Sequence, residues 1–124
     1  MEEEYVKLNT ARLLKEKGFN VACNNILKED GSRMNTLFRA NKDLPRGCYS
    51  QPSQSIASKW LRETKNLYIN IYNNACGYGY IICKSSNGTC ISDDYMSGPN
   101  EGGVWDTYEE ALEAGLVSCL NILK

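Results

Sequence analysis

The sequence predicts an α+β fold, in which antiparallel sheet packs against three helices in the order α-ββ-α-βββ-α. Three stretches repeat apolar residues at the spacing of an amphipathic helix. Five shorter stretches read as strands, and turn-forming residues separate them at hairpin distances. A chain of 124 residues has the length of a single domain, so residues 1–124 are expected to fold as one unit. The pattern leaves open whether the hairpin and the meander share one sheet.

The first helix is expected to begin near Leu8 and to end at Gly18. Leu8, Ala11 and Leu14 recur at helical spacing and form one apolar stripe. Gly18 favours the left-handed conformation that ends many helices. Phe19 can then fold back on Leu14, as it would in a Schellman motif.

A hairpin is expected after the first helix. Residues 20–28 and 33–40 flank residues 29–32, which form a cluster of turn-forming residues. Residues 41–50 are expected to form a loop, because the run Leu-Pro-Arg-Gly within them interrupts any regular pattern.

The second helix is expected to start at Pro52, because proline suits the first turn of a helix, where its missing amide would have no partner. Residues 67–72 and 78–83 alternate as strands and are joined by a loop of hairpin length. Asn87-Gly88 predicts a tight turn into a third strand. These three strands should form an antiparallel meander.

The meander should have two unlike faces. Leu67, Ile69 and Ile71 point to one side, which we expect a helix to cover. The other side is expected to carry tyrosines, and Tyr78 and Tyr80 are candidate residues of a binding surface there. The alternative is that the chain's own helices cover the tyrosines, because aromatic residues in strands commonly serve packing.

The last helix is expected to open at Asp106-Thr107 and to carry a long apolar stripe. Gly115 lies on that stripe. Glycine within a helix costs about 1 kcal/mol relative to alanine. We therefore expect a strand or another helix to pack closely against Gly115.

The net charge and the distribution of apolar residues argue against several classes of protein. The net charge is -1, which argues against general nucleic-acid binding, since that requires an excess of basic residues. There is no run of about 18 apolar residues that could span a membrane. Residues 2–4 are acidic and no apolar segment follows them, so no signal peptide is expected. These features predict a cytoplasmic protein in a host cytosol.

The chain has six cysteines and no histidine, which limits the metal sites and the catalytic groups that it could form. No Cys-x-x-Cys pair occurs, so a zinc site would need four scattered thiolates, and buried free thiols are the expected state. Without histidine the chain lacks the usual general base near neutral pH. We therefore expect no metal, no cofactor and no catalytic residues. A thiol- or carboxylate-dependent enzyme remains an alternative.

Candidate binding residues lie in the irregular segment 93–105 and on the second helix. Tyr95 and Trp105 could stack on a base or enter a partner's pocket. Asn100 and the backbone amides of Gly102 and Gly103 could meet an anion. The alternative is a solvated connector in which Trp105 anchors the last helix in the core. Arg62 could pair with a phosphate or carboxylate, although an exposed helical arginine is often only solvated.

Three blocks of the chain resemble a known family. They are residues 5–19 with Cys23 four positions later, residues 52–63, and the run TYEEALEAGL at residues 107–116. Together they are similar to small uncharacterised proteins of Bacteroides-type gut bacteria, their prophages and their phages. The resemblance implies a phage or mobile-element origin and supplies no catalytic residues. Between residues 73 and 103 the chain is richer in Asn, Gly and Cys than the family pattern.

These observations predict a small non-enzymatic binding protein of phage or mobile-element origin. It would inhibit a host defence by sequestering a nucleotide-like signal or by occupying a host protein. The alternative is a structural or assembly component that acts by self-association into a homo-oligomer.

Overall fold

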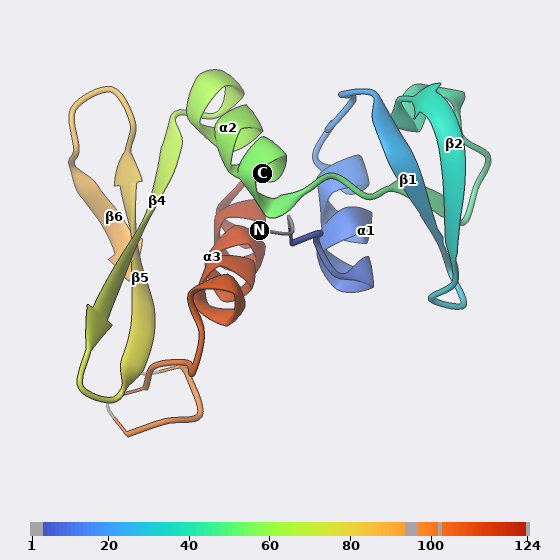
Figure 1. Cartoon of the computed structure of the whole chain (residues 1–124). Coiled ribbons are helices and arrows are strands. Elements are labelled where there is room, and N and C mark those ends of the chain that lie inside the picture. The colour runs from blue at the N-terminus through green and yellow to red at the C-terminus, as the bar shows by residue number, and fades with distance from the viewer. Residues whose placement is uncertain (1–3, 94–96, 102, 124) are drawn as a thin grey trace.

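Two three-stranded antiparallel sheets flank three helices in the computed structural model, which describes residues 4–93, 97–101 and 103–123, with the backbone alone at residues 36–38 (Figure 1). One sheet packs on the first helix, and the other packs on the second and third. The predicted α+β class is therefore confirmed. The hairpin and the meander form separate sheets, which settles a point that the sequence left open.

The elements follow the predicted order, with a short helix and a short strand added. In chain order they are α1 (Leu8–Glu16), β1 (Cys23–Lys28), β2 (Arg33–Arg39), the 3-10 helix η1 (Asn41–Asp43), β3 (Cys48–Ser50), α2 (Gln54–Thr64), β4 (Leu67–Asn74), β5 (Gly77–Lys84), β6 (Cys90–Asp93) and α3 (Tyr108–Ile122). The strand orders are β2-β1-β3 and β4-β5-β6. Within the described ranges, no helix has both the length and the apolar composition that a membrane span requires.

The prediction of a simple loop at residues 41–50 was wrong, because this segment contains η1 and β3. β3 pairs with the other side of β1, with Ser50 opposite Ile26. Asn41 fixes the segment, since its side chain donates to the Phe19 carbonyl at 2.8 Å and accepts from the Ser50 amide at 2.9 Å. A strand of three residues is too short for a periodic pattern, so the sequence gives no sign of it.

The end of α1 matches the prediction. Phe19 donates its amide to the Leu14 carbonyl at 2.9 Å, and Gly18 donates to the Lys15 carbonyl at 3.2 Å. These are the two bonds of a Schellman motif. Gly18 has a φ of 95°, and Phe19 is 1% exposed within the core. The motif thus ends the helix and brings the ring of Phe19 against Trp60 of α2. The two rings meet edge-on, with their centroids 5.3 Å apart.

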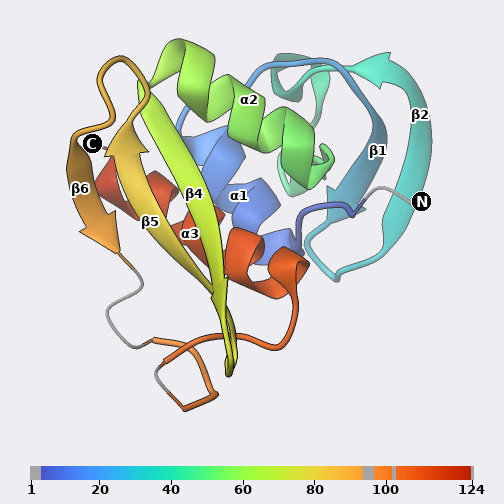
Figure 2. The same ribbon diagram turned by 60° about the vertical axis from the view of Figure 1, so that its left-hand side comes forward.

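Helix α3 lies at the centre of the molecule. It contacts α1, α2, β4 and β5, and Figure 2 shows it running behind β4 and β5. Its stripe supplies Leu116, Cys119 and Leu120, all fully buried, to the core. A Cβ atom on Gly115 would lie 2.8 Å from Cγ2 of Ile69 and 3.3 Å from Cγ of Tyr80. The expected close approach at Gly115 is therefore confirmed.

The expectation that Tyr78 and Tyr80 belong to an exposed face was wrong. The register places Ile71 opposite Tyr80, so the two share a face, and helices cover that face. Tyr80 is 5% exposed, and Tyr78 is partly buried. Tyrosine does appear on the uncovered side, where Tyr68 of β4 is 42% exposed. The chain's own helices cover the β5 tyrosines, as the packing alternative supposed.

Candidate functional site

A cleft of about 310 Å³ lies between α2, β4 and the start of α3. We call it the Arg62 cleft. Its volume falls at the lower end of the range of small-molecule sites. It is lined by Glu4, Gln54, Ser55, Ser58, Arg62, Tyr68, Ile69, Tyr108, Glu109 and Leu112. Segments far apart in the sequence therefore meet there, since the chain end, a helix, a strand and a second helix each contribute.

The wall from α2 follows from helical spacing. Ser55, Ser58 and Arg62 are three or four residues apart, so they share one face of the helix. The helix is started by Ser53, whose hydroxyl accepts the Ile56 amide at 3.2 Å. At its other end Asn66 adopts a φ of 58°, which turns the chain directly into β4. Tyr68 and Ile69 of β4 thereby come to line the same cleft as the helix.

Arg62 is the cation of the cleft. Arg62 is exposed, and within the described ranges its guanidinium has no carboxylate partner. The backbone of Arg62 is fixed, because its carbonyl accepts the Ser85 hydroxyl at 3.0 Å. A guanidinium presents paired N–H donors that match a carboxylate or phosphate. Arg62 is therefore positioned to hold an anionic group at one end of the cleft.

Two tyrosines, Tyr68 and Tyr108, are among the residues that line the cleft. Tyr68 is 42% exposed and Tyr108 is 47% exposed, so each offers ring surface to solvent. Tyr78 supports Tyr108 edge-on, with ring centroids 6.3 Å apart and an interplanar angle of 80°. Exposed aromatic faces stack on planar rings such as nucleobases. The cleft thus combines a cation with aromatic surface.

Ser58 of α2 also lines the cleft. Its Oγ is buried, and it has no hydrogen-bond partner in the part of the chain that the structure describes. A buried hydroxyl without a partner is costly, so a ligand that reached it would recover a hydrogen bond. On another wall, Glu4 and Glu109 place carboxylates beside the cleft. These disfavour a ligand with many negative charges and can accept hydrogen bonds from amino or hydroxyl groups.

Trp105 is an anchor within the fold. Its backbone exchanges two hydrogen bonds with Tyr78, both 2.8 Å long. Its partly buried ring lies 5.7 Å from the ring of Tyr80, with a tilt of 31°. This pairing ties the segment before α3 to β5. The anchoring alternative for Trp105 is what the structure shows.

Asn100 also serves the fold, and this corrects its prediction as an anion ligand. Its side-chain amide donates to the Cys76 carbonyl at 2.8 Å and to Oδ1 of Asp106 at 2.7 Å. The Gly103 amide donates to the Asn100 carbonyl at 2.8 Å, so it is not open to an anion. Tyr95 and Gly102 lie outside the described residues. Among the described residues of segment 93–105, Asn100 and Trp105 thus hold the fold together.

Sequence reasoning found Arg62 and missed most of its neighbours. Ser58 lies one helical turn before Arg62, and this spacing in the sequence indicates that the two side chains share a helix face. Tyr68 and Tyr108 carried no such sign, because their meeting depends on how α3 crosses β4. Of the predicted residues that the structure describes, only Arg62 lines the Arg62 cleft.

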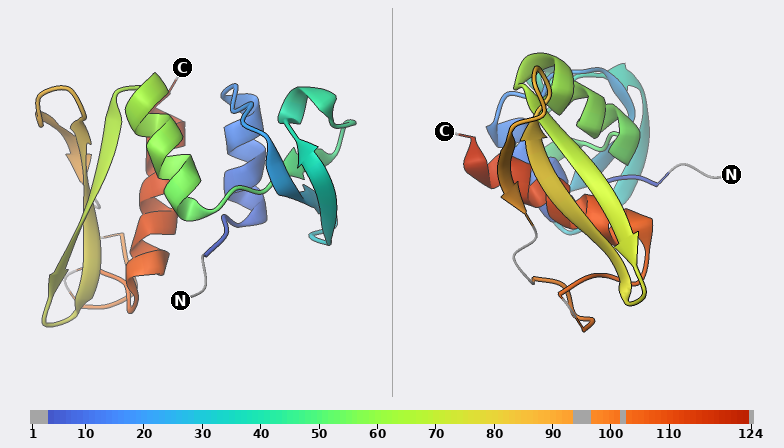
Figure 3. Two further views of the ribbon diagram at one scale, coloured as in Figure 1. Left: turned by 45° about the horizontal axis from the view of Figure 1, so that its top comes forward. Right: turned by 90° about the vertical axis from the view of Figure 1, so that its left-hand side faces the viewer.

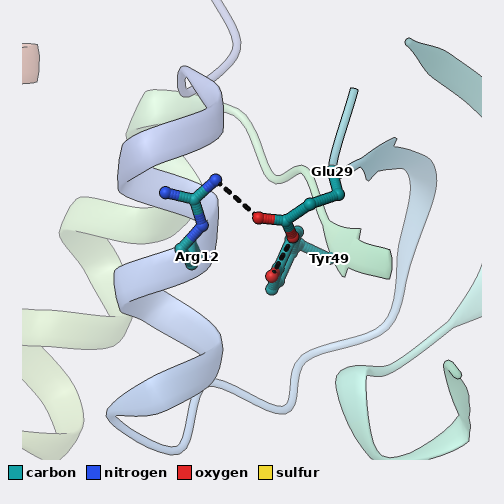
Figure 4. Close-up of polar contacts among 3 residues, drawn as sticks. All are labelled: Arg12, Glu29 and Tyr49. Atoms are coloured by element: carbon teal, nitrogen blue, oxygen red, sulfur yellow. Dashed lines mark hydrogen bonds and ion pairs between the residues drawn. The ribbon is translucent and has the colours of Figure 1, made fainter. Parts of the chain in front are cut away.

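A second polar cluster joins α1 to the first sheet (Figure 4). Nη2 of Arg12 lies 2.8 Å from Oε1 of Glu29, and the Tyr49 hydroxyl donates to the same carboxylate. The hydrogen bond with Tyr49 and the charge of Glu29 raise the pKa of Arg12. The bond to Glu29 also raises the pKa of the Tyr49 hydroxyl. The side chains of Arg12 and Glu29 are both exposed, so this ion pair contributes little to the free energy of unfolding.

The cysteines divide by burial. Burial raises the pKa of Cys23 to about 11 and that of Cys119 to about 12, so both thiols stay protonated near neutral pH. Cys76 and Cys90 are exposed, and Cys48 and Cys83 are intermediate. Among the residues that the structure describes, no group of three or more potential ligands could hold a metal ion.

Comparisons with models of protein families, with curated proteins and with solved structures found no match to this chain.

Proposed function

We propose that this chain is a non-enzymatic binding protein that holds a small nucleotide-like ligand in the Arg62 cleft. The observation that carries the proposal is that Arg62, whose guanidinium has no carboxylate partner among the described residues, lines one cleft together with the exposed tyrosines Tyr68 and Tyr108. Arg62 would hold the single anionic group of the ligand. Tyr108 would stack on its planar ring.

The remaining walls favour a ligand of this kind. Glu4 and Glu109 suit amino or hydroxyl groups and oppose a polyphosphate. The hydroxyl of Ser58 would gain its missing partner. The cleft volume of about 310 Å³ suits a mononucleotide better than a longer oligonucleotide.

The family resemblance gives this binding a biological setting. In a protein of phage or mobile-element origin, capture of a nucleotide-like signal would inhibit a host defence that depends on it. Occupation of a host protein is the other form of the same inhibitory role. Self-association into a structural component remains the alternative, and light scattering on the same sample tests it.

Thermal unfolding with nucleoside 5′-monophosphates tests the proposal. A ligand at a hundredfold its Kd should stabilise the protein by about 2.7 kcal/mol. The matching nucleosides, which lack the phosphate, and ribose 5-phosphate, which lacks the base, should each bind more weakly. If no nucleotide raised the unfolding temperature, the ligand class would be wrong.

Two matched pairs of variants assign the binding to the cleft. Arg62→Ala should weaken binding roughly tenfold or more, because a hydrogen bond to a charged group contributes about 1.5–3 kcal/mol. Lys59→Ala removes an exposed cation from the same helix but not from the cleft, so it should leave the Kd unchanged. Tyr108→Phe should retain binding and Tyr108→Ala should lose it, since stacking requires the ring alone. Equal effects of the Arg62 and Lys59 variants would place the ligand elsewhere.

A further inference from the structure

Cys83 of β5 and Cys90 of β6 stand directly opposite each other in the second sheet. Lys84 donates its backbone N–H to the Thr89 carbonyl at 2.8 Å. On the other side of the pair the register shifts, between Ile82 and Cys83. In a regular antiparallel ladder, a residue pair next to such a bond is of the non-hydrogen-bonded type, in which opposing Cα atoms are about 4.5 Å apart and side chains lie closest. That separation falls within the range of Cα distances that a disulfide spans, about 4.4–6.8 Å.

Both thiols lie on the side of the sheet away from the helices. Ile82 is fully buried on the helix side, so its neighbour Cys83 points to the other face. The right-hand view of Figure 3 shows this face with no helix in front of it. Cys90 is exposed, Cys83 is intermediate, and both are free thiols. A small oxidant in solution can therefore reach the pair.

We propose that Cys83 and Cys90 form a dithiol site that low-molecular-weight disulfides, such as oxidised glutathione, convert reversibly to an intrachain disulfide. Cys90 is the more exposed thiol and reacts first. Its thiolate attacks one sulfur of oxidised glutathione, forms a mixed disulfide and releases one glutathione thiolate.

The second step closes the ring. The Cys83 thiolate attacks the Cys90 sulfur of the mixed disulfide, and the second glutathione leaves as a thiolate. Two electrons pass from the protein sulfurs to the glutathione disulfide. The two protons lost by the cysteines end on the two glutathione thiols. An excess of reduced glutathione or dithiothreitol drives the same steps backwards.

Strand pairing places Cys83 opposite Cys90, and this distinguishes the pair from Cys76, Cys23 and Cys119. Cys76 is also exposed, but it lies in the turn between β4 and β5, outside the strand pairing. Cys23 and Cys119 are buried in the core. β6 is a short strand of four residues with an irregular register next to Cys83, so a disulfide would fix its pairing with β5.

Tryptic mapping after oxidation tests the site. The full-length protein is treated with oxidised glutathione, its remaining thiols are alkylated under denaturing conditions, and it is digested without reduction. Trypsin cleaves after Lys84, which lies between the two cysteines, so the disulfide joins peptides 66–84 and 85–124. Alkylated thiols should fall from six to four, because two are in the bond. Dithiothreitol should restore all six.

Serine variants identify the bonded pair. Cys76→Ser should keep the linked peptides, whereas Cys83→Ser and Cys90→Ser should each lose them. Cys83→Ala provides a second variant if the serine at this half-buried position disturbs folding, and circular dichroism checks each fold. Linked peptides that persist in Cys90→Ser would overturn the proposal. So would a product that stops at the mixed disulfide or that links two copies of the chain.

Discussion

The carboxylate of Glu113 on α3 accepts a hydrogen bond from the side-chain amide of Gln54, the first residue of α2, at 2.9 Å. The same carboxylate accepts the backbone amide of Lys7 at 2.9 Å and the hydroxyl of Thr10 at the start of α1. The first turn of a helix has unpaired N–H groups and a partial positive charge. One carboxylate on α3 therefore joins the beginnings of α1 and α2, which fixes how these helices meet.

Glu113→Gln should destabilise the fold by about 2 kcal/mol, since hydrogen bonds to a charged group contribute about 1.5–3 kcal/mol. The variant keeps the size of the side chain, but its amide replaces one of the two acceptor oxygens with an NH2 group, which then faces either Gln54 or the donors of Lys7 and Thr10. Urea unfolding followed by circular dichroism measures the loss. Glu63→Gln, at an exposed position on α2, is the control and should change stability by less than about 0.5 kcal/mol. A Glu113 variant as stable as this control would show that the junction contributes nothing.

Gly115→Ala should also destabilise the protein, by about 1–3 kcal/mol, even though alanine is the better helix former. The new methyl group would meet Cγ2 of Ile69 at 2.8 Å, which forces the helix or the strand to shift. Unfolding in urea should show a lower midpoint with an unchanged m-value.

Ile69→Leu provides a test of this cause, because leucine keeps the volume but lacks the branch methyl on Cβ. The double variant Gly115→Ala/Ile69→Leu should be more stable than the sum of the two single effects predicts. Strict additivity would mean that the strain lies somewhere other than the contact between α3 and β4.

The features of the fold that could be predicted from the sequence are those set by residues close together in the chain. Gly18 ends α1 through its own conformation, and the stripe of α3 repeats over 15 residues. The face of β5 was ambiguous, because one side presents Tyr80 and Ile82 and the other Ile81 and Cys83, all apolar. Only the register with β4 decides which side is buried, and that depends on where the turn begins.

The candidate site could be predicted only in part for a similar reason. Arg62 is recognisable as a cation on a polar helix face. Its neighbours Tyr68 and Tyr108 come from segments whose approach is set by the packing of α3. Asn100 was misread because its partners, Cys76 and Asp106, become neighbours only when the segment before α3 folds against the β4–β5 turn.

Stability should fall as the pH rises above about 9, in part because of Cys119. Burial raises the pKa of this thiol to about 12 in the folded protein, compared with 9.0 for an ordinary thiol. Above pH 9 the unfolded chain releases this proton and the folded protein does not, so alkali favours unfolding. The contribution is fully present below pH 9 and is lost as the pH rises toward 12. Each pH unit within this window costs at most about 1.4 kcal/mol per thiol.

Cys119→Ala isolates this effect from the tyrosines and lysines that also titrate in alkali. The variant should be less stable than the natural protein near neutral pH, because a buried group is lost. Between about pH 8 and 10.5, however, its free energy of unfolding should fall less steeply. Urea unfolding across this range gives the two slopes, and parallel curves would contradict a buried, protonated Cys119.

Asn100→Asp should destabilise the segment before α3 more than its small change in size suggests. The substitution removes both side-chain donors and turns a carboxylate toward the Cys76 carbonyl and the Asp106 carboxylate. Trp105 follows in the same segment and pairs with Tyr78, so its fluorescence reports the loss of packing. We expect lower thermal stability together with a shift of the tryptophan emission toward that of a solvated ring.

Charge repulsion can be separated from loss of the donors by a second substitution. Asn100→Asp/Asp106→Asn removes one of the two facing carboxylates and supplies a new amide donor, so it should recover part of the stability. Asn70→Asp, at an exposed position on β4, controls for the added charge and should leave the fluorescence unchanged. If the double variant were no more stable than Asn100→Asp, the contact with Asp106 would not hold this segment. The bond to the Cys76 carbonyl would then be the one that ties it to the β4–β5 turn.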